Sequence, residues 1–399
     1  MMHQTLMTSP APAELSRYHA GLGGCRFCPM CKVAGDVSKL TFLESHSTRA
    51  RAMMLWRARH ELQSLSVRQV ELLYQSTLDS ISEAWCISHA PVSSYVAEAR
   101  AAVFEAGLAP DVVMAAVERV APEPPPVKAN MLLLAGEAAE AGDAEAASFA
   151  AEMLRQNQSY GDVEVVVVAS GALAYALGAR GIARRQAEVV LDRIACAGAT
   201  EVIADGPQTL WTLRRIYPLL GVSLPDGVVV SSLSEKLMDV VGGDAPAHSG
   251  NGAAHHDASG RKRAVFLDSR SACLVADSMA IGEAIQPGFR GPESALGAGE
   301  VFEAPRRVVD SLGIDRIYSV WSRSLARSSG ADDGLWLTYP DLAGQLARHR
   351  LQEAKRQHAD LLVTDSLLSA RHLARHAQLD DVSVQWLPEV VAEAKMRCL

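Results

Sequence analysis

Ala199-Thr-Glu-Val-Ile-Ala-Asp205 and Ala359-Asp-Leu-Leu-Val-Thr-Asp365 are two versions of one pattern. Each is a short apolar run of strand length that ends in an aspartate, and each is followed eight residues later by a leucine, Leu213 or Leu373. An internal duplication is the simplest explanation for such similarity at two distant places. The sequence therefore predicts two related units, each built around a buried strand.

The regions around both stretches alternate between strand and helix patterns. Apolar runs of strand length and helical segments follow one another from 158 to 241 and again from 263 to 399. Such alternation is typical of α/β units with mainly parallel sheets. Residues 242–262 hold five glycines and no apolar side chain larger than Ala or Pro, which predicts a flexible linker between the units.

The N-terminal part has helical patterns instead. Ser47 or Thr48 can cap a helix, and Ser66-Val-Arg-Gln69 has the form of a capping box before an apolar helical run. An Ala-rich helix follows until the prolines at 122–126 stop it, and an Ala/Glu-rich helix is expected over 128–157. We therefore predict an α+β multidomain chain: a helical domain (1–157), an α/β domain (158–241), a linker (242–262) and a second α/β domain (263–399).

Composition excludes several classes of protein. The chain has 399 residues, of which 49% are apolar and 21% charged, so it can bury a core. Because it lacks an apolar run of about 18 residues and a signal-like N-terminus, we expect no membrane span and a cytoplasmic location. The net charge of −8 argues against nucleic-acid binding, although residues 1–60 carry eight basic and three acidic side chains.

The cysteines are unevenly placed. Their odd number argues against a disulfide framework, and three of them form Cys25-Arg-Phe-Cys28-Pro-Met-Cys31. Three thiolates at this spacing can hold three corners of an iron–sulfur cubane. A zinc site normally needs a second distant pair of ligands, so zinc and plain structural thiols are the weaker alternatives. The remaining cysteines are Cys86, Cys196, Cys273 and Cys398.

A fourth ligand is needed for a [4Fe–4S] cluster. In bacterial ferredoxin motifs the fourth cysteine of one run ligates the other cluster, and here that position is Gly35. Positions 76, 79, 82 and 86 have the ferredoxin spacing, but only Cys86 is a cysteine. If the last cysteine of each run binds the cluster of the other run, Cys86 would complete the cluster held by Cys25, Cys28 and Cys31. The cluster that the second run would hold has no cysteine ligand left. The predicted set is Cys25, Cys28, Cys31 and Cys86; the other three cysteines are expected to be free thiols.

Over nearly its whole length the chain resembles a family of iron–sulfur proteins. Its members have a two-cluster, ferredoxin-like helical domain followed by two cysteine-rich CCG-type domains, as in glycolate oxidase and lactate-utilisation iron–sulfur subunits and heterodisulfide reductase subunits. The resemblance is carried by the cysteine run and by four further segments: Glu44–Arg51 (family E-x-x-S-P-R-G-R), Ser76–Cys86 (C-T-L-C-G-L-C-E-E-W-C-P), Gly206–Pro218 (C-P-x-C-Y-x-T-L-x-x-x-Y-P) and Glu303–Arg306 (E-x-P-R).

The CCG motifs themselves are degenerate. The tripeptides fall at Ala169-Ser-Gly171 and Ser328-Ser-Gly330, and a strand-end D-P-C-H falls at Asp268-Ser-Arg-Ser271. The paired C-x2-C positions are occupied by Gly206, Thr209, Ser366 and Ser369. Since every cysteine of these motifs is absent, we expect neither the second type of cluster nor disulfide-reducing chemistry. The α/β units are expected to serve as a scaffold and docking surface.

The resemblance implies an electron-transfer subunit with no catalytic residues of its own. Electrons would come from a partner dehydrogenase that holds FAD or FMN and oxidises a 2-hydroxy acid or small amine. They would pass to a quinone, an electron-transfer flavoprotein or another carrier, and such a complex could lie at the inner membrane. Arg26, Lys32, Arg49 and Arg51 would raise the cluster's potential if they lie beside it, or are ordinary surface charges. The alternatives are an assembly subunit with a structural cluster and a zinc-stabilised interaction module.

Overall fold

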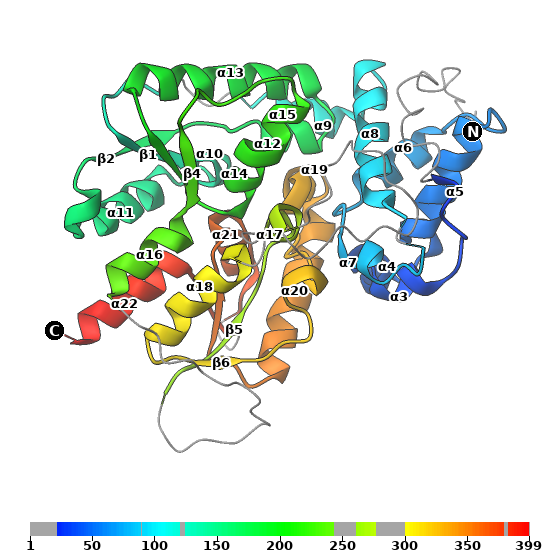
Figure 1. The fold of residues 1–399 in the computed structure, drawn as a ribbon. Helices are drawn as coiled ribbons and strands as arrows, with labels where there is room; N and C mark the ends of the chain where they lie inside the picture. Colours follow the sequence, from blue (N-terminus) through cyan, green and yellow to red (C-terminus); the bar gives the residue numbers. More distant parts are fainter. Residues whose placement is uncertain are drawn as a thin grey trace.

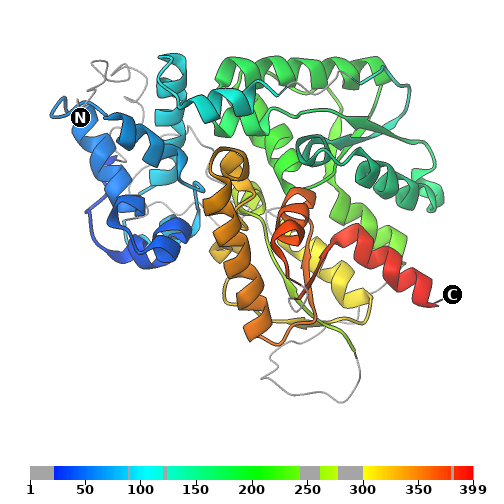
Figure 2. The same cartoon turned by 180° about the vertical axis from the view of Figure 1, so that it is seen from behind.

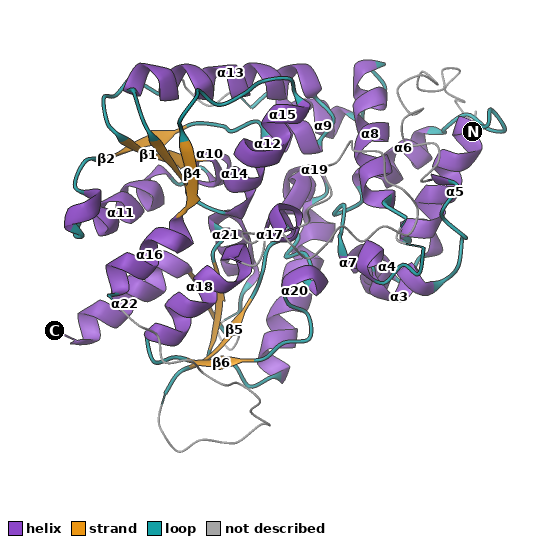
Figure 3. Ribbon diagram, in the orientation of Figure 1, coloured by secondary structure: helices purple, strands orange, loops and turns teal. Residues whose placement is uncertain are grey.

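The computed structural model describes residues 22–88, 90–119, 124–242, 261–276, 300–378 and 382–398. It contains a helical N-terminal region and two four-stranded parallel sheets flanked by helices (Figure 1). The strands form two separate groups, both away from the N-terminal helices (Figure 3). The mixed architecture with parallel sheets is as predicted. Apart from its ends, the expected linker lies outside the described residues.

The N-terminal region consists of short helices that pack around α8. Ser47 caps α5 by accepting the Ala50 N–H, and Ser66 and Gln69 form the predicted capping box of α6. The helices are α3 (Met30–Ala34), α4 (Asp36–Thr41), α5 (Thr48–Arg59), α6 (Val67–Tyr74), α7 (Ile81–Ala84), α8 (Val92–Glu105) and α9 (Asp111–Val117).

The first α/β unit has its strands in the order β2-β1-β3-β4, all parallel. Its strands are β1 (Met131–Ala135), β2 (Val163–Val167), β3 (Glu201–Ala204) and β4 (Val229–Ser232). Its helices are α10 (Gly136–Ala141), α11 (Ala144–Arg155), α12 (Ala172–Ala176), α13 (Arg180–Ala197), α14 (Pro207–Trp211), α15 (Tyr217–Leu219) and α16 (Leu233–Val241).

The second unit repeats this topology in the order β6-β5-β7-β8, again all parallel. Its strands are β5 (Arg263–Phe266), β6 (Asp315–Ile317), β7 (Leu361–Thr364) and β8 (Ser383–Trp386). Its described helices are α17 (Arg270–Ala276), α18 (Glu300–Ser311), α19 (Leu335–Thr338), α20 (Pro340–Arg356), α21 (Leu367–His376) and α22 (Leu387–Cys398).

The two units match at single residues as well as in strand order. Gly171 and Gly330 follow the second strand of each unit and have left-handed backbones, with φ of 96° and 94°. A Cβ atom at Gly171 would lie 2.8 Å from the carbonyl oxygen of Ala183, and one at Gly330 would lie 2.5 Å from that of Ala343. Only glycine fits such a turn against a helix. The internal duplication is therefore confirmed at the level of topology.

The predicted helix over 128–157 is wrong in its first part. Met131–Ala135 forms β1, which pairs with both β2 and β3 and is the second strand in the sheet. Residues 132–135 are completely buried, as expected for a strand covered on both faces. The many Ala and Glu residues of α10 and α11 obscured this short apolar run. The first α/β unit thus begins before residue 158, and residues 1–157 are not all helical.

The units share a core and contact the N-terminal helices. One buried apolar cluster joins Leu133 and Ile203 of the first sheet to Val363 and Trp386 of the second. Helix α16 packs against α18, and α4 packs against α20, beside which the N-terminal helices lie in the rear view (Figure 2). A helix with the length and apolar character needed to cross a bilayer is absent from the described ranges.

Candidate functional site

The cysteine run occupies a tight loop and one short helix. Cys25 donates its backbone N–H to the Leu22 carbonyl at 3.2 Å, and Phe27 then adopts a left-handed backbone with φ of 51°. Cys28 precedes helix α3, and Cys31 lies in its first turn. All three cysteines are partly buried. The loop and the start of α3 therefore carry three partly buried thiols within seven residues.

Cys86 approaches this loop from a separate segment. It follows α7 and hydrogen-bonds through its N–H to the Glu83 carbonyl at 3.0 Å. Burial raises the pKa of the Cys25 thiol, and the neighbouring Cys86 and Cys28 raise it further. Burial likewise raises the pKa of Cys31 to about 11, with added repulsion from Cys25 and Cys28. Cys25 is thus coupled electrostatically to Cys28 and Cys31 of its own loop and to Cys86, about sixty residues further along the sequence.

Their ligand role remains a prediction. Within the described part of the chain, no three His, Cys, Asp or Glu side chains are arranged to hold a metal ion. The chemistry of the donor set nevertheless fits a cluster, because four partly buried thiols that repel one another as thiolates need a cationic centre to remain deprotonated together.

Two backbone N–H groups point at sulfur atoms of the site. The Phe27 N–H hydrogen-bonds the Cys25 sulfur, and the Arg49 N–H, in the first turn of the twelve-residue helix α5, hydrogen-bonds the Cys31 sulfur. Each of these bonds lowers the thiol pKa. Helix N-termini favour negative charge, so α5 is placed to stabilise an anionic group held by these cysteines.

The basic residues expected beside the site divide into two groups. Lys32 and Arg49 both pair with Glu44, at 3.2 and 2.5 Å, and Arg49 also donates to the Phe27 carbonyl at 3.1 Å. Arg51 is buried, and its guanidinium donates to three backbone carbonyl oxygens, those of His46, Leu72 and Gln75. Arg49 therefore braces the cysteine loop, whereas Arg51 has a structural role in joining α5 to α6.

Three of the positions that the ferredoxin pattern would give to a second cluster, Gly35, Asp79 and Ser82, are linked by polar contacts. A Cβ atom on Gly35 would lie 3.1 Å from the Ser82 hydroxyl oxygen. Ser82 donates its N–H to Asp79 at 3.0 Å and accepts the Thr48 hydroxyl at 2.9 Å. These three residues are therefore neighbours in space.

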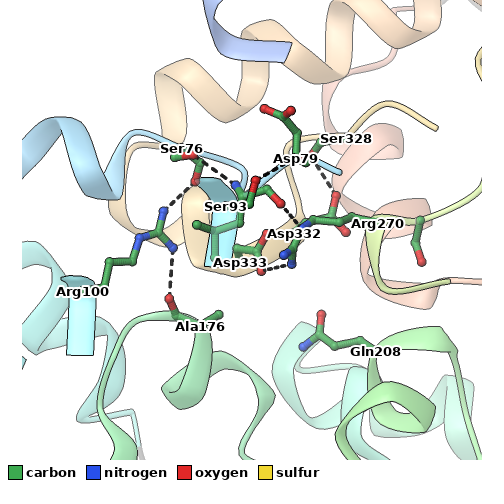
Figure 4. A network of polar contacts seen from close by, with 12 residues as sticks. Ser76, Asp79, Ser93, Arg100, Ala176, Gln208, Arg270, Ser328, Asp332 and Asp333 are labelled. Atoms are coloured by element: carbon green, nitrogen blue, oxygen red, sulfur yellow. Dashed lines mark hydrogen bonds and ion pairs between the residues drawn. The ribbon is translucent and has the colours of Figure 1, made fainter. Parts of the chain in front are cut away.

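A buried network of polar contacts joins the N-terminal region to the α/β units (Figure 4). Arg100 of α8 donates to the carbonyl oxygens of Ser76 and Ala176, at 2.7 and 3.0 Å. Arg270 pairs with Asp333 at 2.7 Å and donates to the Leu78 carbonyl. These contacts join the N-terminal region to both α/β units.

The cavity beside this network is small. It lies between the two units, is lined by Gln208, Trp211 and Asp333 among others, and has a volume of about 10 Å³. Such a volume holds about one water molecule. This cavity cannot admit a metabolite without movement of the surrounding chain.

Sequence reasoning missed Glu137, which joins the two units. Its buried carboxylate accepts the Gln208 N–H at 3.0 Å from its own unit, and the Ser366 hydroxyl at 2.7 Å and the Leu368 N–H at 3.2 Å from the other. Gly206 lies against it, where any side chain would overlap the carboxylate. Burial, and then the charge of Asp205, raise its pKa. The signal was present as an acidic residue just after a wholly apolar strand.

The second unit has a related acidic cluster at the ends of β5 and β7. Arg306 of α18 donates to both carboxylate oxygens of Asp268, at 2.8 and 2.6 Å, and the Arg323 N–H donates to the same carboxylate at 2.7 Å. Asp365 is buried nearby, and its Oδ1 atom accepts no hydrogen bond from any residue that the structure describes. Burial, followed by repulsion from Asp268, raises the pKa of Asp365 to about 8.

Because the pKa of Asp365 is raised, the stability of the folded protein depends on pH in a definite direction. Between its ordinary pKa of 3.8 and about 8, Asp365 is protonated in the folded protein and ionised in the unfolded chain, so stability falls as pH rises through that range. Asp365→Asn mimics the protonated acid. We expect it to raise the melting temperature at pH 8, by the equivalent of about 1 kcal/mol or more, and to leave it unchanged at pH 4.

Differential scanning calorimetry at the two pH values checks this prediction. Asp226→Asn is the control for loss of one charge, because Asp226 is exposed. Equal melting temperatures for Asp365→Asn and the wild type at pH 8 would show that the buried carboxyl ionises without cost.

Comparisons with known proteins give information about the fold and not about the function. No protein-family model matches the sequence, and no curated protein matches it. The structure is similar to a crystal structure of a hypothetical protein from Helicobacter pylori, with a TM-score of 0.53 over 86% of this chain and 67% of that chain. The two sequences are 9% identical over this alignment. The chain thus shares its overall fold with that protein.

Proposed function

We propose that this chain is an electron-transfer subunit that holds one [4Fe–4S] cluster through Cys25, Cys28, Cys31 and Cys86. The helical region would be ferredoxin-like and the two α/β units degenerate CCG-type domains. The observation that carries the proposal is that Cys86, from beyond α7, lies near enough to Cys25 to raise the pKa of its thiol. A loop of three cysteines needs a fourth donor, and Cys86 is the candidate in the segment that the ferredoxin pattern indicates.

The residues around the thiols suit an anionic redox group. Bound there, a [4Fe–4S] cluster would supply one-electron transfer at a potential set by hydrogen bonds and nearby charge. The N–H groups of Phe27 and Arg49 donate to sulfur, and the α5 N-terminus adds positive potential. Arg49 also fixes the loop through the Phe27 carbonyl. These groups stabilise added negative charge and therefore favour the reduced state.

Large apolar side chains lie exposed beside the cysteines. Met30 and Val33 of α3 are 47% and 60% exposed, and Ile87, directly after Cys86, is 83% exposed. Exposed apolar side chains gathered in one region are typical of a protein contact surface. They support docking of a redox partner close to the thiols, which we propose to be an FAD- or FMN-containing dehydrogenase that acts on a 2-hydroxy acid or small amine. A quinone or other carrier would be the acceptor.

Metal analysis and a redox assay test this proposal. We expect anaerobically purified protein to contain about four iron and four acid-labile sulfide per chain. We also expect visible absorption that bleaches when the partner flavoprotein and its substrate are added. One zinc ion per chain and no acid-labile sulfide would instead identify a zinc-stabilised interaction module. A cluster that substrate and flavoprotein fail to reduce would identify an assembly subunit with a structural cluster.

A further inference from the structure

Arg327 is a buried cation without a hydrogen-bond acceptor. The residue is 1% exposed, and its guanidinium carbon lies 3.8 Å from the centre of the Trp321 ring. None of its three guanidinium nitrogen atoms has a hydrogen-bond partner among the described residues. Stacking on an aromatic ring offsets part of the cost of burial, but it leaves the in-plane N–H groups unsatisfied. A buried guanidinium in this state calls for an acceptor that the described residues do not supply.

Neighbouring groups add to the positive charge. The Lys39 ammonium lies 5.2 Å from the centre of the same Trp321 ring. Arg350 is buried, and its Nε and Nη1 atoms have no hydrogen-bond partner among the described residues, although Nη1 lies 3.1 Å from Glu353. Asp36 lies 4.0 Å from Arg350 Nη1, and burial raises its pKa to about 7. Three basic groups therefore face three acids, Glu353, Asp36 and Asp79, and Asp36 is incompletely ionised near neutral pH.

The arginine is not a requirement of the fold. When Gly171 of the first unit is matched with Gly330 of the second, Val168 corresponds to Arg327. Val168 is buried. The same loop thus folds with an apolar residue at this position. In the second unit this position holds a buried cation without hydrogen-bond partners among the described residues, which destabilises the fold. Such a residue is unusual unless its charge has a functional role.

We propose that Arg327, with Arg350 and Lys39, forms a binding site for a small oxyanion, a carboxylate or a phosphate. The site follows β6, at the carboxyl side of the second parallel sheet, where ligands of open α/β sheets commonly bind. It lies between that sheet and helix α4, whose Asp36 accepts the Ser328 N–H at 2.9 Å. This proposal does not depend on the cysteine site.

The guanidinium geometry selects the class of ligand. Its N–H groups form a planar fork that matches two oxygens of a carboxylate or phosphate, and the aromatic ring beneath Arg327 holds the fork in place. An anion would give the guanidinium of Arg327 the hydrogen-bond acceptors that the described residues do not supply.

Isothermal titration calorimetry on the full chain tests the site. Inorganic phosphate and malonate are titrated separately at constant ionic strength, with chloride as the reference anion. We expect saturable binding of at least one of them to the wild type, and a loss of at least tenfold in affinity in Arg327→Gln. Arg323→Gln is the matched control, since it removes one charge from the same loop at a partly exposed residue that pairs with Glu303.

A second variant separates binding from folding. Arg327→Val installs the residue type that the first unit carries, so we expect it to fold and to lose binding as Arg327→Gln does. Binding of phosphate but not malonate would identify a phosphate site, and the reverse a carboxylate site. The proposal is overturned if neither anion binds the wild type more tightly than chloride, or if Arg327→Gln and Arg323→Gln weaken binding equally.

Discussion

Cys86→Ala is expected to cost the purified protein most of its iron, its acid-labile sulfide and its visible absorption. Three thiolates from one loop leave a corner of a cubane open, and clusters with an open corner are prone to lose iron. Cys86 is among the groups that raise the pKa of the Cys25 thiol, and it comes from a segment whose other ferredoxin positions are Ser76, Asp79 and Ser82.

Cys196→Ala and Cys273→Ala are the controls and should leave the absorption unchanged. Cys196 lies on α13 beside Asp192, and Cys273 is buried in α17 with its thiol directed to the carbonyl oxygens of Ser269 and Arg323. Iron and sulfide analysis with the absorption spectrum measures all three variants. A full cluster in Cys86→Ala would show that the cross-ligation argument is wrong.

Gly178→Ala is expected to destabilise the fold strongly. Gly178 lies in the turn between α12 and α13 with φ of 90°, and a Cβ atom there would lie 2.5 Å from the carbonyl carbon and oxygen of Arg100. These are backbone atoms of α8, which cannot move aside as the end of a side chain can. The turn would have to separate from α8 and break the hydrogen bond from Arg100 to Ala176. We expect a loss of about 3 kcal/mol or more in stability.

Gly198→Ala is the control that separates the steric overlap from the cost of the left-handed backbone. Gly198 ends α13 with φ of 70°, but nothing lies within 4 Å of a Cβ atom there. Alanine at this position carries only the cost of a left-handed backbone, about 1–2 kcal/mol. Scanning calorimetry compares the two variants. If both lowered the melting temperature equally, the contact of the turn with α8 would contribute nothing beyond backbone strain.

Local patterns in the sequence predict much of the fold. The matched strands that end at Asp205 and Asp365 are β3 and β7, and the duplication inferred from them appears as one strand order used twice. Apolar runs bounded by turn residues carry this information in the sequence itself. β1 was missed because its five apolar residues adjoin an Ala/Glu-rich helical stretch, and only pairing with β2 and β3 distinguishes a strand from a buried helical segment.

The candidate site also contains features that the sequence predicts and features that it does not. The cysteine spacing is a local signal, and the neighbourhood of Cys86 followed from a known pattern of shared ligands. The local sequence marks Glu137 only as an acidic residue just after an apolar strand, and it does not mark Arg327 at all. The partners of neither residue could be predicted. Glu137 acquires its role from Ser366 and Leu368, which lie more than two hundred residues away. Arg327 acquires its role from Trp321 and from the absence of hydrogen-bond acceptors within the described parts of the fold.

The hydrogen bond from the Ser328 N–H to Asp36 has a consequence for synthesis on the ribosome. It joins residues 292 positions apart and buries a carboxylate of the cysteine-bearing region. At roughly 5–20 residues per second, Ser328 emerges about 15 to 60 s after Asp36. During that interval α4 has no second unit to pack against, and its acidic end remains in water. The N-terminal helices are therefore open on this face until the second α/β unit has been synthesised, and only then can that unit pack against them.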